Sequence, residues 1–155
     1  GMAYRCKNDK NWTMEFISEG CKELTGYKAE ELLNNNKQAY GSLIDSGHRS
    51  RVWDKIQTAL QQRQSFAVEY KIFTKNKKVK WVWEQGQGIY DKSGSLLNIQ
   101  GFIIDITERR RLEEKLKEVK FNLSSGRVKN TKEAKKIKKD IARILTILNE
   151  SSYEK

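Results

Sequence analysis

The chain has 155 residues and a formal net charge of +11, with 37% apolar and 10% aromatic residues. This length allows one modest domain with an appendage, or two small domains. No apolar run approaches the roughly 18 residues of a membrane span, no signal-peptide core opens the chain, and Cys6 and Cys21 stand singly. Composition therefore argues against membrane insertion, structural zinc and a disulfide framework, and we expect a cytoplasmic protein.

The first half of the chain predicts short strands and short helices. Gly1 and Met2 are set aside as the remnant of a cleaved tag. Two short strands are expected around an asparagine-rich turn, followed by a helix that closes at Gly26 and a second helical piece that the run 34–36 stops. The expected strands and helices lie at 4–6, 14–17, 18–26 and 27–33.

A longer amphipathic helix is expected after His48, and three strands follow it. Alternation over 66–73 predicts a half-buried strand, and turns at 75–78 and 91–94 lead into two more strands. Two strands, several short helices and a three-strand meander predict an α+β fold, a five-stranded antiparallel sheet with short helices on one face. The apolar face of the long helix consists of Val52, Trp53, Ile56, Ala59 and Leu60.

The last strand runs directly into a charged segment. Residues 101–106 are mostly apolar and several are β-branched, whereas the residues from Thr107 onward are charged and favour a helix. A buried strand is therefore expected to join a solvated helix with almost no loop. Such a stiff junction, Asp105-Ile106-Thr107, can carry strain from a sheet into a helix, which is a requirement of a sensor.

Three segments in this order resemble a PAS domain of the PAS-3 type. They are Trp12–Tyr27, Trp81–Gly86 and the ending Asp105-Ile106-Thr107, and together they cover about residues 4–110. The resemblance implies a sensory domain at 4–107 followed by a signalling helix from 108. One departure is that the family usually has His-Pro-Asp-Asp before its long helix, whereas this chain has residues 45–49 as Asp-Ser-Gly-His-Arg and contains no proline.

PAS domains are sensors and dimerising modules, so the resemblance implies a homodimer and a pocket between the sheet and the short helices. Apolar periodicity indicates burial first, so each candidate lining residue is more often plain core than a ligand contact. A filled pocket would leave a module that binds a protein partner instead of a small molecule. The candidate lining residues are Phe16, Cys21, Leu24, Leu43, Trp53, Ile56, Val68, Tyr70, Trp83 and Phe102.

No cofactor, metal site or catalytic motif is identified. Flavin photochemistry in light-sensing relatives needs an Asn-Cys-Arg-Phe type motif, which is missing, and Cys21 is expected to be a buried, inert thiol. Haem would need an axial ligand, but His48 is expected to be an exposed residue at a helix start. Gly86-Gln87-Gly88 is interpreted as a bulge inside a strand, and without a nucleophile elbow, a phosphate loop or HExxH the protein is expected to be non-enzymatic.

The tail predicts a basic antiparallel helical hairpin. Residues 107–155 hold 15 basic and 8 acidic side chains, a net charge of +7, against +4 for residues 1–106. A first helix is expected to end at Gly126, and Asn130 with Glu133 forms a start resembling a capping box. The first stripe could also pair as a short coiled coil. The two apolar stripes are Leu112, Leu116, Val119 and Leu123, and Ala134, Ile137, Ile141, Ile144 and Leu148.

Residues 121–126 and 140–146 resemble the L-twenty-nine family of large-subunit ribosomal proteins, over about 112–150. Members are small two-helix hairpins that pack on ribosomal RNA, so the basic side chains opposite the stripe are candidate phosphate contacts. A solvated basic face is the alternative. The candidates are Lys135, Lys136, Lys138, Lys139 and Arg143.

Two functions follow. One is a PAS module that binds a small molecule or protein partner and transmits through Asp105-Ile106-Thr107. The other is an RNA- or ribosome-associated protein in which PAS is a passive dimeriser. The hairpin takes the place of an effector, which argues against a truncated kinase or cyclase input domain.

Overall fold

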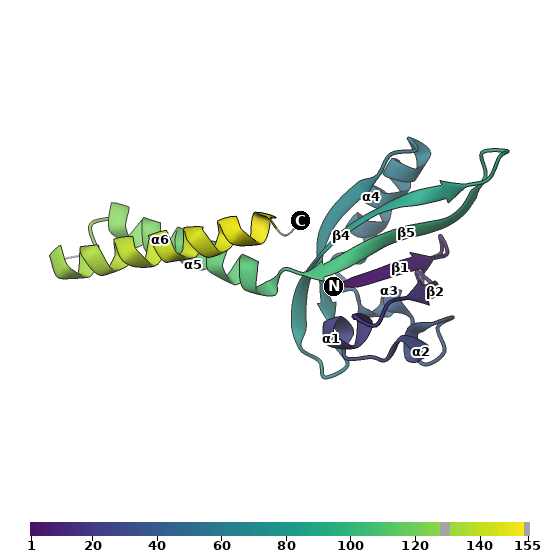
Figure 1. Ribbon diagram of the computed structural model, residues 1–155, viewed down its shortest axis with the longest axis horizontal. Helices are drawn as coiled ribbons and strands as arrows, with labels where there is room; N and C mark the ends of the chain where they lie inside the picture. The colour runs from purple at the N-terminus through teal and green to yellow at the C-terminus, as the bar shows by residue number, and fades with distance from the viewer. Residues whose placement is uncertain (128–130, 154–155) are drawn as a thin grey trace. The chain divides into compact units, whose positions relative to one another are not determined.

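Alternation of buried and exposed side chains builds the sheet. β1 (Met2–Cys6) and β3 (Phe66–Phe73) bury every second residue, as strands with one covered face do. With β2 (Met14–Ile17), β4 (Val79–Tyr90) and β5 (Leu96–Asp105) they form an antiparallel sheet in the order β2-β1-β5-β4-β3. The computed structural model (Figure 1) describes residues 1–127 and 131–153, with side chains described through Glu150.

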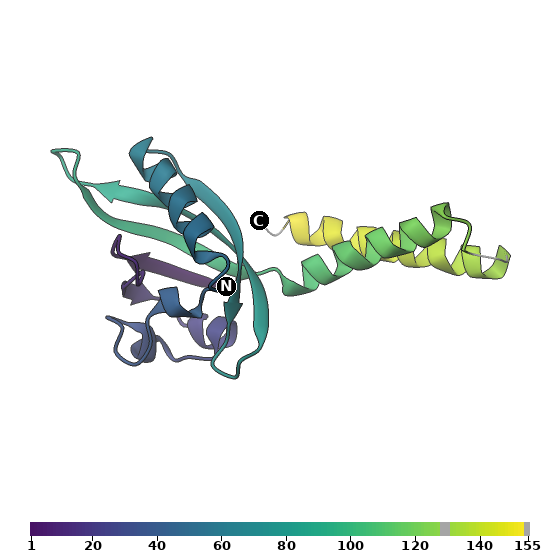
Figure 2. The same ribbon diagram turned by 180° about the vertical axis from the view of Figure 1, so that it is seen from behind.

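Four helices connect β2 to β3, and their buried residues join the core of the sheet. The longest, α4 (Arg49–Gln61), crosses the sheet and buries Val52, Ile56 and Leu60 (Figure 2). Three short helices precede it, so the inner face of the sheet is covered by many small elements instead of one large one. They are α1 (Cys21–Thr25), α2 (Ala29–Leu32) and α3 (Tyr40–Leu43).

The two edge strands are covered by the chain segments that cross beside them. At β3, the amide of Asp45 donates to the Lys71 carbonyl at 2.9 Å, and His48 Nδ1 accepts from the Lys71 amide at 3.0 Å. At β2, the Asn34 amide donates to the Met14 carbonyl at 2.8 Å. These contacts occupy backbone groups that would otherwise invite pairing with another strand.

One cross-strand row determines the space available inside the core. Tyr4, Gly101, Gly86 and Phe66 are consecutive partners on β1, β5, β4 and β3. A Cβ on Gly86 would lie 2.6 Å from the Phe66 ring and 3.0 Å from the Tyr4 hydroxyl, and one on Gly101 would lie 2.3 Å from the Gln85 carbonyl oxygen. Glycine is therefore required at both positions so that the Tyr4 ring can lie across the sheet.

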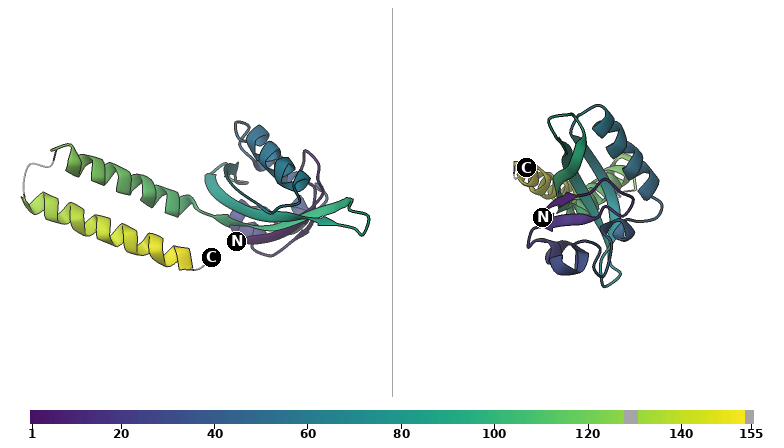
Figure 3. Two further views of the ribbon diagram at one scale, coloured as in Figure 1. Left: turned by 90° about the horizontal axis from the view of Figure 1, so that it is seen from above. Right: turned by 90° about the vertical axis from the view of Figure 1, so that its right-hand side faces the viewer.

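The chain divides into two units between Ile106 and Thr107. In the second unit, α5 (Thr107–Ser124) and α6 (Thr131–Tyr153) run antiparallel (Figure 3). Gly126 follows α5 with a φ of 73°, the left-handed conformation of a glycine that ends a helix. The predicted cap at Asn130 lies outside the described residues.

The predicted fold class is confirmed, with three differences in detail. Met2, which was set aside with Gly1, belongs to β1 and is 1% exposed, so it is part of the fold. Gly86 sits in regular register, and the irregularity of β4 falls between Ile89 and Tyr90. The four-residue helix α3 was not expected. Among the described residues, no helix has the length and apolar character required to cross a membrane.

Candidate functional site

The space between the sheet and the helices is almost completely filled. Of the predicted lining residues, Cys21, Leu24, Leu43, Ile56, Val68 and Tyr70 belong to one buried core, and Trp53 packs against it. A cavity of about 10 Å³ remains beside Tyr4, Cys6 and Trp12. That volume is enough for about one water molecule. The structure thus brings these predicted residues together as core, and the cavity beside Tyr4, Cys6 and Trp12 has no room for a larger ligand.

Three predicted lining residues lie on the opposite, outer face of the sheet. Phe16 is 51% exposed, Phe102 is 44% exposed, and the Trp83 ring meets Phe102 edge-on at 5.6 Å. The error has a simple cause, because alternate residues of a strand face opposite sides. On β4 the inward side chains are Val82 and Glu84, so Trp83 must point outward.

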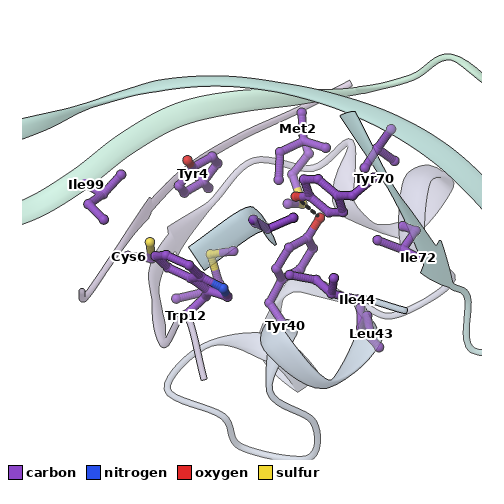
Figure 4. Close-up of a cluster of buried hydrophobic side chains, with 14 of the residues drawn as sticks. Met2, Tyr4, Cys6, Trp12, Tyr40, Leu43, Ile44, Tyr70, Ile72 and Ile99 are labelled. Atoms are coloured by element: carbon purple, nitrogen blue, oxygen red, sulfur yellow. Dashed lines mark hydrogen bonds between the residues drawn. The ribbon is translucent and has the colours of Figure 1, made fainter. Parts of the chain in front are cut away.

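A buried carboxyl group, not anticipated from the sequence, lies at the centre of the inner face. The Tyr4 hydroxyl donates to one carboxyl oxygen of Glu84, and the Tyr70 hydroxyl donates to the other at 2.5 Å. The hydroxyls of Tyr40 and Tyr70 are 3.0 Å apart, a hydrogen bond drawn in Figure 4. The network thereby joins β1, β3, β4 and α3 around a side chain that is 6% exposed.

Burial sets the protonation behaviour of this cluster. It raises the pKa of Glu84 above its usual value, while the hydrogen bonds from Tyr4 and Tyr70 act in the opposite direction. It also raises the pKa values of Tyr4, Tyr40 and Tyr70 well above 10.0, with the nearby Glu84 charge as a further cause. The three phenols therefore remain neutral hydrogen-bond donors, and the charge of Glu84 depends on the balance between burial and these hydrogen bonds.

The two residues weighed for cofactor chemistry both have protein partners. The Cys21 thiol is buried, lies 3.6 Å from the Thr25 hydroxyl and 3.5 Å from the Tyr27 carbonyl, and burial raises its pKa. His48 is the residue before α4, but it is half-buried instead of exposed, because its Nδ1 accepts the Lys71 amide and its ring lies 5.5 Å from Trp81. Within the described residues, no group of three or more His, Cys, Asp or Glu side chains could hold a metal ion.

The predicted junction is short and anchored. β5 ends at Asp105 and α5 begins at Thr107, so Ile106 alone separates them. Ile106 is buried, and its amide donates to the Trp81 carbonyl at 2.9 Å. Lys80 lies 3.5 Å from the Asp105 carboxylate and donates to the Glu23 carbonyl of α1 at 2.8 Å. The end of the sheet is therefore tied both to the helix that follows and to the first helix of the core.

The outer face carries a groove of about 630 Å³ across β1, β4 and β5. Phe16 and Phe102 flank it, and Gln85, Gln87 and Gln100 line it with amide groups. One ion pair balances the local charge, between Arg5, which lines the groove, and Glu15 at 3.6 Å. This combination of aromatic side chains, amides and balanced charge is that of a protein contact surface.

The basic residues predicted in the tail share one exposed side of α6. Ile144 on the same helix is buried, and the other stripe residues Ile137 and Ile141 are half-buried. The exposed basic side chains are Lys135, Lys136, Lys138, Lys139 and Arg143.

Comparison with known proteins finds two families in the chain. The model described as PAS fold matches residues 14–103, and the model described as Ribosomal L29 protein matches residues 106–150. The methyl sulfide methyltransferase-associated sensor of Methanosarcina acetivorans is 27% identical over 107 residues, 68% of this chain but 10% of that protein. The chain thus spans only a tenth of that sensor's length.

Two further matches cover the tail and the fold. Large ribosomal subunit protein uL29 of Trichlorobacter lovleyi is 50% identical over 44 residues, which are 28% of this chain and 71% of that protein. The crystal structure of a sensory box histidine kinase/response regulator from Burkholderia thailandensis superposes with a TM-score of 0.63 at 26% identity, covering 80% of this chain and 91% of that one. The chain therefore belongs to the PAS fold family, and its residues 106–150 belong to the ribosomal L29 protein family.

Proposed function

We propose that this chain is a non-enzymatic, cytoplasmic PAS sensory and dimerisation module that transmits through Asp105-Ile106-Thr107 to α5. The observation that carries the proposal is the single buried residue between β5 and α5. A flexible linker would lose a displacement of the sheet before it reached the helix. Here the Ile106 amide is hydrogen-bonded to β4, so a shift of β4 against β5 would displace the residue that precedes the helix.

The filled interior favours a protein partner over a small molecule as the input. A cavity of about 10 Å³ excludes any ligand much larger than water unless side chains move. The outer face instead exposes Phe16 and Phe102 beside a groove of about 630 Å³. We take a second copy of the chain as its occupant, because the paired charges of Arg5 and Glu15 at the groove leave little net charge to repel an identical surface.

Sedimentation velocity of the full chain tests this surface. Phe16→Glu and Phe102→Glu each place a charge in the proposed contact, and each should convert a dimer into a monomer. Leu97→Glu is the matched control, since Leu97 is 57% exposed at the start of β5 and lies outside the residues that line the groove. A wild-type monomer at tens of micromolar, or a dimer that survives both phenylalanine variants, would contradict the proposal.

Hydrogen exchange tests transmission. In the wild type, raising the protein concentration through the dimerisation range should increase protection of the first turns of α5 as well as of the outer face. Inserting Gly-Ser-Gly between Ile106 and Thr107 should uncouple α5 and leave the dimer intact. Equal responses of α5 in both proteins would show that the short junction transmits nothing.

Native mass spectrometry of the same samples would reveal a retained small molecule, which would replace the second copy as the input.

A second function is favoured by one specific observation, the exposed basic face of α6 on a hairpin of the ribosomal L29 family. In this alternative the tail binds RNA through phosphate contacts, and the PAS unit only dimerises. Lys135, Lys136, Lys138 and Lys139 are all exposed, and helical geometry places them opposite the apolar stripe. Phosphate contacts of this kind release counterions and therefore weaken as salt rises.

RNA binding can be measured with a structured ribosomal RNA fragment at several salt concentrations. Charge reversal of the four lysines to glutamate should abolish binding and its salt dependence. A variant with Lys7, Lys22, Lys55 and Lys92 reversed changes the net charge equally, on exposed positions of the PAS unit. Equal losses in both variants would indicate non-specific attraction by net charge alone, and salt-insensitive binding would contradict a phosphate interface.

A further inference from the structure

The Glu84 cluster has the construction of a charge-sensitive lock. Its carboxyl group receives hydroxyl hydrogen bonds from β1 and β3, through Tyr4 and Tyr70, and Tyr40 extends the network to α3. Gly86 and Gly101 leave the space in which the Tyr4 hydroxyl reaches it. Glu84 itself is paired with Ile103, two residues before Asp105.

Among the residues that the structure describes, no Lys, Arg or His side chain lines the cavity at Glu84. The titratable groups facing it are Tyr4 and Cys6 from β1, Tyr70 from β3 and Tyr40 from α3. The remaining lining residues of its cavity, in the part of the chain that the structure describes, are apolar: Trp12, Met14 and Ile44. A charged carboxylate in such a place has to attract water or be neutralised by a proton.

Two walls of the cavity do not belong to the sheet. One is the four-residue helix α3 with Ile44 after it, and the other is the turn that carries Trp12. Trp12 adopts a φ of 50°, which bulky side chains rarely occupy, and Asp9 Oδ1 holds the turn by accepting the amides of Asn11 and Thr13. These short elements lie outside the five strands, and Ile44 is joined to β3 by an isolated antiparallel bridge to Ile72.

We infer that Glu84 is a proton-operated lock of the PAS core, closed while the carboxyl group is protonated and opened to water at α3 and the Trp12 turn when the proton is lost. The closed state has space for one water at most, so the two phenol hydroxyls are the main hydrogen-bond donors that a carboxylate would find there. The raised pKa of Glu84 agrees in direction, since burial favours the protonated form. Opening of the core at Glu84 does not require dimerisation, so a monomeric protein in the sedimentation experiment would not contradict it.

Hydrogen exchange of the full chain at several pH values, corrected for intrinsic amide rates, tests the lock. As the pH rises above the ordinary titration range of carboxyl groups, wild-type peptides covering 7–13 and 38–46 should lose protection by up to about tenfold per pH unit, as release of one proton requires. Glu84→Gln keeps the shape without the charge and should remove this pH dependence. Glu30→Gln, on the exposed surface of α2, should behave as wild type.

Infrared spectroscopy provides an independent readout. At the low-pH end of the series, before protection is lost, wild-type protein should show the carbonyl stretch of a buried protonated carboxyl group, which Glu84→Gln lacks. If Glu84→Gln does not fold, Tyr70→Phe serves instead. It removes one donor to the carboxylate, so opening should begin at higher pH than in wild type. Absence of the infrared band, or pH-independent protection of 7–13 and 38–46 in wild type, would overturn the inference.

Discussion

The PAS unit and the hairpin are stabilised in different ways. In residues 1–106, a single core of fully buried side chains runs from Met2 in β1 to Ile103 in β5. In the hairpin, Leu112 and Ile144 are the buried side chains among the residues that the structure describes. Its apolar stripes are otherwise half-buried, and Phe121, at 57%, is exposed. Burial of apolar surface is the dominant stabilising term, so the first unit should be far more stable than the second.

This contrast assigns different tasks to the two units. A well-filled core suits a scaffold that holds a buried carboxyl group in place, whereas a thinly packed helix pair depends on helix propensity and on whatever covers its stripes.

The unfolding of the two units can be followed separately. All four tryptophans, Trp12, Trp53, Trp81 and Trp83, lie in the first unit. Tryptophan fluorescence therefore reports the unfolding of the PAS unit, and circular dichroism reports mainly the long helices.

Truncating the PAS core should have the largest effect. Ile103→Ala removes a fully buried side chain beside Met2 and Glu84, and should lower the free energy of unfolding by about 2–5 kcal/mol. Urea unfolding followed by tryptophan fluorescence measures it. Leu97→Ala, at a position that is 57% exposed, should change that free energy by less than about 0.5 kcal/mol. Similar losses in both variants would show that the core is not the source of stability.

The same truncation in the hairpin should cost less. Ile144→Ala removes a buried contact from a thinly packed pair and should destabilise the helices by about 1–2 kcal/mol, at the low end for large-to-small changes. The loss should appear in the circular dichroism transition and leave the tryptophan transition in place. A matching shift of the tryptophan midpoint would show that the two units unfold together, and the contrast between them would fail.

The predictable and unpredictable parts of this fold have different physical origins. The strands at 66–73 and 14–17 and the junction at Ile106 follow from alternation and composition, which are local properties. Alternation assigns residues to two faces but does not say which face is buried, and Trp83 was placed inside because large aromatic side chains are usually core. On β4 the outer face carries Trp81 and Trp83, whereas Glu84 and Gly86 face inward.

The Glu84 cluster illustrates the same limit. Its hydroxyl partners, Tyr4, Tyr40 and Tyr70, are spread over 66 residues and meet only through strand pairing and α3. The one local signal was the period of β4, which puts Glu84 on the same face as the apolar Val82. The four residues of α3 are too few to show a helical period, so the element that positions Tyr40 could not be predicted.

The smallest effect is expected where the PAS unit relies on charge. The Glu31 carboxylate in α2 accepts hydrogen bonds from the Lys75 ammonium at 2.9 Å and from the Lys28 amide at 2.8 Å. The Lys37 ammonium lies 3.8 Å from the same carboxylate. The hydrogen bond from Lys75, with that from the Lys28 amide, holds the pKa of Glu31 below its usual value. A lowered carboxyl pKa contributes stability above the unfolded-state pKa, and this contribution is lost as the pH falls through the folded-state pKa.

Glu31→Gln should therefore lower the free energy of unfolding at neutral pH, and the difference from wild type should shrink as the solution is acidified. Tryptophan-monitored urea midpoints between about pH 7 and about pH 3 measure this difference, across the range in which carboxyl groups titrate. Glu30→Gln, exposed on the same helix, is the control and should show little change at any pH. A difference that stays constant on acidification would mean that Glu31 acts as a neutral cap of α2, so that charge contributes nothing to holding the short helices on the sheet.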